Sequence, residues 1–458
     1  MLLTRTGHKS NIKALIETGR GMGPMTPGQP PDPTNLGMVP TPARPGFRQT
    51  KCRKTRTKTD ERFAEPPGSL PADGGNLVVP WSAADRHRAT RTSKSSMSCP
   101  ACFVRGSDFM SELFDQAQAS AATSEANNPP AASIRHRDGI LEVPGELQLH
   151  LGGSLPRVHI AWRMSGPEVG PVVVALGGIS ADRRVVTVSP QEPGWWQGVA
   201  GVGKALPAER CRILSFDYLG GSGETTGPVG ASPFPAISSY DQADILLRLL
   251  NHLGIKTLHA LFGASYGGMV GLTFAEKYPE RLARLCVISA ADRSNPMATA
   301  WRSVQRGIVR FAQQHGDAAG GLKLARALGM ATYRSQEEFA ARFSASPQRD
   351  GDRHVFAVEK YLFSRGEEFV QRHRPEAFLA LSESIDLHRV DATRIFVPTS
   401  AIAIAEDQLV PLADVRAMVA RLPNAQLIEL SSVYGHDAFL KENAQLKPLF
   451  AGLLEPSR

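Results

Sequence analysis

The pattern of apolar positions divides the chain near residue 135. Up to that point proline and glycine recur, and no helical or strand period persists, which predicts an unfolded N-terminal extension over residues 1–135. Beyond it, short apolar runs typical of buried parallel strands alternate with longer stretches typical of helices. This alternation predicts an α/β fold with a mostly parallel, doubly wound sheet.

The expected strands are short apolar runs separated by helical stretches. The runs are 172–176, 212–216, 258–262, 285–289, 395–404 and 426–430. The helical stretches between and after them are 239–253, 268–278, 412–421 and 438–454. Upstream, the alternation in 146–150 and 158–162 predicts that these two segments pair as antiparallel strands.

A long helical insertion is expected before the last two strands. Between Ala290 and Arg394 there is no strand signal, and the stretch is typical of several helices, such as 298–314 and 355–373. An insertion at this point would lie over the carboxyl ends of the strands. We therefore expect a helical lid over 294–394, on a core formed by 136–293 and 395–458.

Charge is distributed unevenly along the 458 residues. The formal net charge is +8, but residues 1–110 alone carry +9, so the remainder is close to neutral. The basic balance therefore belongs to the extension, and we interpret the basic cluster at 51–58 as a solvated tail, not a nucleic-acid contact. The sequence has no apolar run of 18 or more residues, so no membrane span is expected.

The five cysteines show no disulfide framework. They are Cys52, Cys99, Cys102, Cys211 and Cys286, an odd number without regular spacing, which fits a reducing cytoplasm. The pair Cys99 and Cys102 has the spacing of a zinc or redox motif but lacks a second ligand pair and a surrounding βαβ pattern. We expect neither a metal site nor a cofactor.

One motif carries the chemistry. Gly263-Ala264-Ser265-Tyr266-Gly267 follows an apolar run and precedes a helical stretch, which is the context of a nucleophile elbow. The turn is crowded, so small residues are needed two positions before and two after the serine, and glycine occupies both. Ser265 is therefore the predicted nucleophile of an α/β-hydrolase fold.

A serine nucleophile needs a base, and the base needs an acid that orients it. His436 is the one histidine after the serine that falls in a loop directly behind the last strand; the others lie in the helical insertion. Asp407 closes the preceding strand and is the predicted acid, because its loop faces that of His436. The alternatives are Asp292, which follows the preceding strand, and Glu406, which is adjacent to Asp407.

The oxyanion hole requires two backbone N–H groups. That of Tyr266, directly after the nucleophile, is the first. The second is expected from Gly177 or Gly178, in the loop after the strand at 172–176, with Gly177 preferred.

Several further motifs resemble one family of this fold. From about residue 140 the chain is similar to the homoserine O-acyltransferases of methionine biosynthesis. The matching segments, in order, are 194–196, 202–205, 221–228, 263–269, 301–306, 332–335 and 435–440. They cover both the core and the lid.

The resemblance implies a ping-pong transfer. An acyl-CoA, the co-substrate, would acylate Ser265, and the side-chain hydroxyl of L-homoserine would take up the acyl group. By the same resemblance Arg334 would bind the carboxylate of the amino acid and Asp437 its ammonium group, in a homodimer. Without the resemblance, Arg334 would pair with an acid of the lid and Asp437 would cap the final helix.

Donor and acceptor remain open from the sequence. The chain resembles a compact subgroup associated with succinyl transfer, so succinyl-CoA is preferred to acetyl-CoA, and L-serine stays open as the acceptor. The competing hypothesis is an ordinary serine hydrolase acting on small esters. A third is a non-catalytic binding protein whose basic tail contacts nucleic acid, which the complete Ser-Asp-His set disfavours.

Overall fold

A computed structural model describes residues 134–230 and 233–455. The expected N-terminal extension, the cluster at 51–58 and the Cys99–Cys102 pair lie outside these residues. In the described part, no helix is both long enough and apolar enough to cross a membrane.

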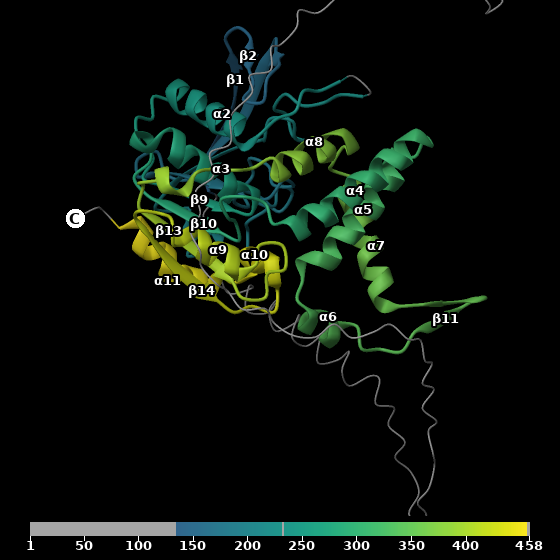
Figure 1. Cartoon of the computed structure of the whole chain (residues 1–458). Helices are drawn as coiled ribbons and strands as arrows, with labels where there is room; N and C mark the ends of the chain where they lie inside the picture. The colour runs from purple at the N-terminus through teal and green to yellow at the C-terminus, as the bar shows by residue number, and fades with distance from the viewer. Residues whose placement is uncertain (1–133, 231–232, 456–458) are drawn as a thin grey trace, which may run out of the picture. The chain divides into compact units, whose positions relative to one another are not determined.

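The centre of the fold is an eight-stranded sheet (Figure 1) in the order β1-β4-β8-β5-β9-β10-β13-β14. The first three strands of this order pair antiparallel and the remaining pairs are parallel. The strands are β1 (His136–Val143), β4 (Val158–Ser165), β5 (Val172–Leu176), β8 (Arg212–Phe216), β9 (Ala260–Ala264), β10 (Leu285–Ile288), β13 (Thr399–Ile404) and β14 (Ala425–Leu430). The mostly parallel sheet confirms the predicted fold class.

Helices cover both faces of the sheet, because its central strands are buried on both sides. One apolar core includes residues of α2 (Ser239–His252), α3 (Tyr266–Lys277) and α9 (Leu412–Val419). The second, around Trp196, includes residues of α10 (Ala438–Lys441) and α11 (Asn443–Leu454). The sheet is therefore doubly wound, as predicted.

The insertion after β10 is built from helices that pack on one another beside the carboxyl ends of the strands (Figure 1). They are α4 (Pro296–Gln314), α5 (Ala318–Tyr333), α6 (Gln336–Arg342), α7 (Ala357–Val370) and α8 (Pro375–Asp386). Asn295 begins α4 by accepting a hydrogen bond from the N–H of Met297, and Asp317 caps α5 in the same way. Val309, Leu322 and Phe369 form part of the lid's own small core.

The short connections add three two-stranded sheets and three turns of 3-10 helix. The strands are β2 (Leu147–Gln148) with β3 (Ser154–Leu155), β6 (Ala200–Gly201) with β7 (Leu206–Pro207), and β11 (Gln348–Asp350) with β12 (Arg353–Val355). The 3-10 turns are η1 (Pro279–Arg281), η2 (Ala392–Arg394) and η3 (Gly435–Asp437).

Three expectations about local structure were wrong. The segment 158–162 does not pair with 146–150; β4 pairs with β1, and β2 pairs with β3. The lid contains the hairpin β11–β12, whose strands are almost entirely exposed and so have no apolar alternation to reveal them. The expected final helix 438–454 is two helices, because the chain leaves helical geometry at Glu442 (φ −83°, ψ 51°).

Candidate active site

Ser265 stands between β9 and α3 in a strained conformation. Its φ of 54° lies in the left-handed region that residues with a side chain rarely adopt. The strain persists because its N–H donates to the carbonyl of Ile288, 2.9 Å away, while its own carbonyl accepts the N–H of Gly268, also at 2.9 Å. The serine side chain is thereby held at the carboxyl edge of the sheet, at the start of a helix.

The two glycines of the motif are required by close backbone approach. A Cβ on Gly263 would lie 2.3 Å from the carbonyl oxygen of Gly267, and one on Gly267 would lie 2.2 Å from that of Leu176. Both distances are far inside van der Waals contact, so a larger residue at 263 would push the strand away from the start of α3, and one at 267 would push the elbow away from β5. The spacing in the sequence follows from this crowding.

The three predicted catalytic side chains form one hydrogen-bonded chain. Nε2 of His436 lies 2.9 Å from Oγ of Ser265, and Nδ1 lies 2.7 Å from Oδ2 of Asp407. An ionised carboxylate can only accept, so Nδ1 carries the proton of the neutral ring and Nε2 is free to accept from the serine. The arrangement can deprotonate Ser265.

Asp407 is fixed by its own loop. It is 4% exposed, and its second oxygen accepts the N–H groups of Leu409 and Val410 at 2.9 and 3.0 Å. Burial acts to lower the pKa of His436, but the nearby carboxylates, Asp407 above all and then Asp437, outweigh it, so the pKa lies above its ordinary value. The carboxylate therefore both orients the ring and stabilises its protonated form.

The rival acids have other partners. Asp292 accepts from the guanidinium of Arg421 at 2.7 Å, and Glu406 accepts the hydroxyl of Ser431 and the N–H of Ser432. Neither is bonded to His436 in the described part of the chain, whereas Asp407 is.

The two glycines after β5 have different surroundings. The carbonyl of Gly177 accepts the N–H of Gly267 and the hydroxyl of Tyr218, at 2.9 and 2.7 Å, and so joins this loop to the elbow. Gly178 lines the cavity, and a Cβ placed on it would lie 3.9 Å from Oγ of Ser265. The structure thus places Gly178 beside the nucleophile, and the donation of an N–H to the oxyanion by Gly177 or Gly178 stays a prediction. The side chain of Tyr266 is buried and hydrogen-bonded to Ser384, which leaves its backbone N–H as its part of the site.

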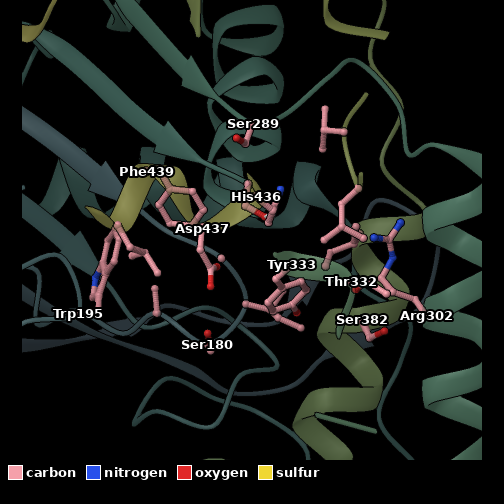
Figure 2. A pocket seen from close by; sticks show the side chains of 18 of the residues that line it. Ser180, Trp195, Ser289, Arg302, Thr332, Tyr333, Ser382, His436, Asp437 and Phe439 are labelled. Carbon is pink, nitrogen blue, oxygen red and sulfur yellow. The ribbon is translucent and has the colours of Figure 1, made fainter. Parts of the chain in front are cut away.

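A cavity of about 410 Å³ opens above Ser265 and His436. Its walls come from the loops that follow β5, from the loop carrying His436 and from lid helices (Figure 2). Trp195 and Phe439 line one part of the cavity, and Arg302, Thr332 and Ser382 line another. The lid therefore roofs the nucleophile, as the position of the insertion predicted.

The two predicted substrate-binding residues lie against each other. Asp437 lines the cavity, and its carboxylate points into it (Figure 2). Nε of Arg334 is 3.1 Å from Oδ2 of Asp437, and its Nη1 is 3.2 Å from Glu338, so the expected pairing with a lid acid is present. The expected cap is absent: Asp437 makes no side-chain hydrogen bond to the start of α10. Their roles toward a substrate stay predictions.

The contact between Arg334 and Asp437 is an ion pair without hydrogen-bond geometry. The buried Nε–H of Arg334 accordingly has no hydrogen-bond partner among residues 134–230 and 233–455. A buried donor without an acceptor is costly, and the attraction of the neighbouring Asp437 carboxylate offsets part of that cost.

The sequence did not identify two other polar groups of the cavity. Arg302 stood within a matching segment but received no role, and Ser289 was assigned only to the end of a strand. The positive φ of Ser289, 50°, has no signature in the residue type. Which face of α4 meets the cavity depends on how the lid packs, and the local sequence does not contain that information.

Comparison with known proteins agrees with this geometry. The family described as the alpha/beta hydrolase fold matches residues 171–442. The homoserine O-succinyltransferase of Xanthomonas campestris pv. campestris is 41% identical over 330 residues, which cover 71% of this chain and 86% of that protein. The homoserine O-acetyltransferase of Clavibacter michiganensis subsp. michiganensis is 31% identical over 374 residues, or 71% and 96%.

A solved structure supports the fold. The homoserine O-acetyltransferase from Bacillus anthracis superposes with a TM-score of 0.63 over 71% of this chain and 99% of that one, at 19% identity. The sequence relationships, at 41% and 31% identity, show the family as well as the fold. The chain belongs to the homoserine O-acyltransferase family, within the α/β-hydrolase fold.

Proposed function

We propose that this chain transfers a succinyl group from succinyl-CoA to the side-chain hydroxyl of L-homoserine, through an ester on Ser265. The observation that carries the proposal is the carboxylate of Asp437, which faces the cavity directly beside the catalytic histidine. A fixed anion at that place suits the ammonium group of an amino acid, and a small neutral ester has no use for it. The preference for succinyl follows the relationship to the Xanthomonas succinyltransferase.

The first half-reaction forms the acyl-enzyme. His436 takes the proton of Ser265 through Nε2, and Oγ attacks the thioester carbonyl. The carbon–sulfur bond breaks, and the proton passes from His436 to the departing thiolate of CoA. The N–H groups of Tyr266 and Gly178 stabilise the negative charge on the tetrahedral intermediate, the first of these because the opening N–H groups of a helix have no partner within the helix.

The second half-reaction reverses these roles. His436 takes the proton of the acceptor hydroxyl, which attacks the acyl carbon, and Ser265 leaves with that proton returned to it. Asp437 holds the ammonium group of the acceptor, and the guanidinium of Arg334, which lies against Asp437, attracts the carboxylate of the acceptor. Water can replace the acceptor only if it reaches the ester, and the lid limits that access.

The remaining features of the proposal concern the setting of the reaction. The chemistry uses acyl-CoA as a co-substrate and calls for no bound metal or cofactor, since proton transfer and ester formation need only the triad. We place the enzyme in the cytoplasm as a homodimer without nucleic acid or membrane partners. The two cysteines in the described residues, Cys211 and Cys286, are free and buried.

The test is release of CoA, measured with succinyl-CoA or acetyl-CoA in the presence and absence of L-homoserine, with L-serine as a parallel acceptor. Turnover that depends on homoserine and is faster with succinyl-CoA supports the proposal. Steady release without any acceptor would instead identify a hydrolase, and dependence on serine would identify a serine O-acyltransferase.

A further inference from the structure

Two arginines of the lid share a single aspartate behind the cavity wall. Nε of Arg302 lies 2.8 Å from Oδ1 of Asp386, and Nη1 of Arg306 lies 2.6 Å from Oδ2. The three side chains are only 10–12% exposed. Burial acts to raise the pKa of Asp386, but Arg302 and the hydrogen bonds it receives outweigh burial, so the pKa lies below its usual value. Asp386 is therefore ionised, and the cluster carries one surplus positive charge.

In the described part of the chain, no second carboxylate neutralises the surplus positive charge. Within residues 134–230 and 233–455, Asp386 is the acid that lies in ion-pair distance of Arg302 and Arg306. Both arginines also have neutral partners: Nη1 of Arg306 donates to the carbonyl and the hydroxyl of Ser382, both at 3.0 Å, and Nη2 of Arg302 donates to the hydroxyl of Ser294. Two buried guanidinium groups that share one carboxylate keep a net positive charge, and burying that charge costs free energy unless a further anion binds beside it. Arg302, of the two, is the one that lines the cavity.

The part of the cavity wall around Arg302 contains further polar side chains that could bind a polar ligand. Gln305 lies three residues later on α4, hence on the same side of the helix, and lines the same cavity. Ser289, also at the cavity, has a buried hydroxyl without a hydrogen-bond partner in the described residues. Buried polar groups normally have partners, so the unpartnered hydroxyl of Ser289 points to a ligand group or water that enters the cavity.

These groups lie within reach of the nucleophile. Ala264 and Ile288 are paired across β9 and β10, so Ser265 and Ser289 follow neighbouring strands at the same level. The positive charge of Arg302 also acts to lower the pKa of the catalytic histidine, in the same direction as burial and against the larger effect of Asp407. An acyl group carried by Ser265 is therefore next to Ser289 and close to Arg302.

We propose that Arg302 binds the free carboxylate of a dicarboxylic acyl group, such as succinyl, while Ser265 attacks or carries its other end. The inference rests on the proposed function and names the residue that selects the donor. Gln305 and Ser289 line the same cavity and add neutral hydrogen-bonding groups for the oxygen atoms at the two ends of the acyl group. An acetyl group has no second carboxylate and leaves Arg302 without a ligand.

The acceptor is assigned to a different part of the cavity. The carboxylate of Asp437 points away from the guanidinium of Arg302, and the two face separate parts of the space around His436 (Figure 2). The carboxylate of Asp437 and the guanidinium of Arg334 together suit the two charged ends of an amino acid. The surplus charge at Arg302 is then left for the acyl donor.

The test compares acylation by succinyl-CoA and acetyl-CoA without any acceptor, as the burst of CoA released, at a pH where His436 is neutral in every variant. Arg302→Gln should lower the second-order rate constant for succinyl-CoA by about ten- to a hundredfold, the loss expected for one charge-assisted contact, and change that for acetyl-CoA little. Arg302→Lys keeps the positive charge but not the planar guanidinium that can bind a carboxylate through two N–H groups, so its rate constant for succinyl-CoA should fall less. The CoA portion is common to both donors, so its binding cancels in their ratio.

Arg326→Gln is the matched control, because Arg326 lines the same cavity but lies over the rings of Tyr333 and Phe369, 5.1 and 4.6 Å from their centroids. The succinyl-to-acetyl ratio should not move in that variant. Equal losses for both donors in Arg302→Gln would overturn the assignment, as would a loss confined to discharge by homoserine. If wild-type protein acylates from succinyl-CoA but never passes the group to homoserine, the proposed function fails while the donor ratio still tests Arg302.

Discussion

The carboxyl edge of the sheet and the lid contribute to the cavity in different ways. At the sheet edge, Ser265, Asp407 and His436 each follow their own strand, and short backbone turns fix them. In the lid, the groups that face the cavity project from the sides of helices, as Arg302 and Gln305 do from α4. The first region holds the three residues of the catalytic triad, whereas the second adds polar and charged side chains to the wall of the cavity.

The largest effect should follow loss of the nucleophile. Ser265→Ala removes the one atom that forms the ester, so CoA release should fall by a factor on the order of 10⁶ with either donor. The fold should persist, because the removed hydroxyl bonds His436 and contributes no apolar packing. Steady-state release of CoA and thermal melting measure both outcomes. Acylation of this variant at a rate near that of the wild type would show that another residue is the nucleophile.

Removing the orienting carboxylate should come next. Asp407→Asn keeps the shape but no longer holds the ring in the tautomer that accepts from Ser265, so acylation should fall by on the order of 10⁴. Asp292→Asn is the matched control, since its carboxylate pairs with Arg421 at another strand end. Burst kinetics should show a large loss only in the first variant; the reverse pattern would reassign the acid.

The acceptor residues should affect only the second half-reaction. Arg334→Ala or Asp437→Asn removes one charge-assisted contact, worth about 1.5–3 kcal/mol, so apparent affinity for homoserine should fall roughly ten- to a hundredfold. Acylation by acyl-CoA should stay near the wild-type rate. Stopped-flow measurement separates the two steps. Slow acylation with normal discharge would instead place these residues at the CoA or in the triad.

The smallest expected effect is a shift in pH dependence. His436 must be neutral to accept a proton, so acylation should fall as the pH drops through its raised pKa. Asp437 raises that pKa and Arg302 lowers it. The acid limb of acylation should therefore move to lower pH in Asp437→Asn and to higher pH in Arg302→Gln, with acetyl-CoA as the donor. Shifts in the same direction would show that His436 does not feel these charges as described.

The sequence contained most of the sheet edge because the information there is local. The strands at 172–176 and 212–216 have the predicted bounds, and the elbow is fixed by two glycines whose neighbours allow no Cβ. The order of strand, nucleophile and base then placed His436 and Asp407, which the structure brings into hydrogen-bond contact.

What the sequence lacked depends on contacts between distant segments. Strand β4 pairs with β1. The segment 146–150 also alternates between apolar and polar residues, so the sequence pattern alone could not exclude it as the partner of β4. Which of Gly177 and Gly178 donates its N–H depends on the path of one turn, and the sequence does not specify that path. The surplus positive charge at Arg302 arises because Asp386, 84 residues later in the sequence, pairs with two arginines, and only the folded lid brings these residues together.

The most direct measurement is the fate of the acyl group on the protein itself. Wild-type protein is mixed with succinyl-CoA without an acceptor, digested and mapped by mass spectrometry, and a second sample is first treated with L-homoserine. The account predicts one succinyl group on the peptide that contains Ser265, lost on treatment as O-succinylhomoserine appears in equal amount. Release of free succinate without acylated homoserine, or a succinyl group on another residue, would contradict it.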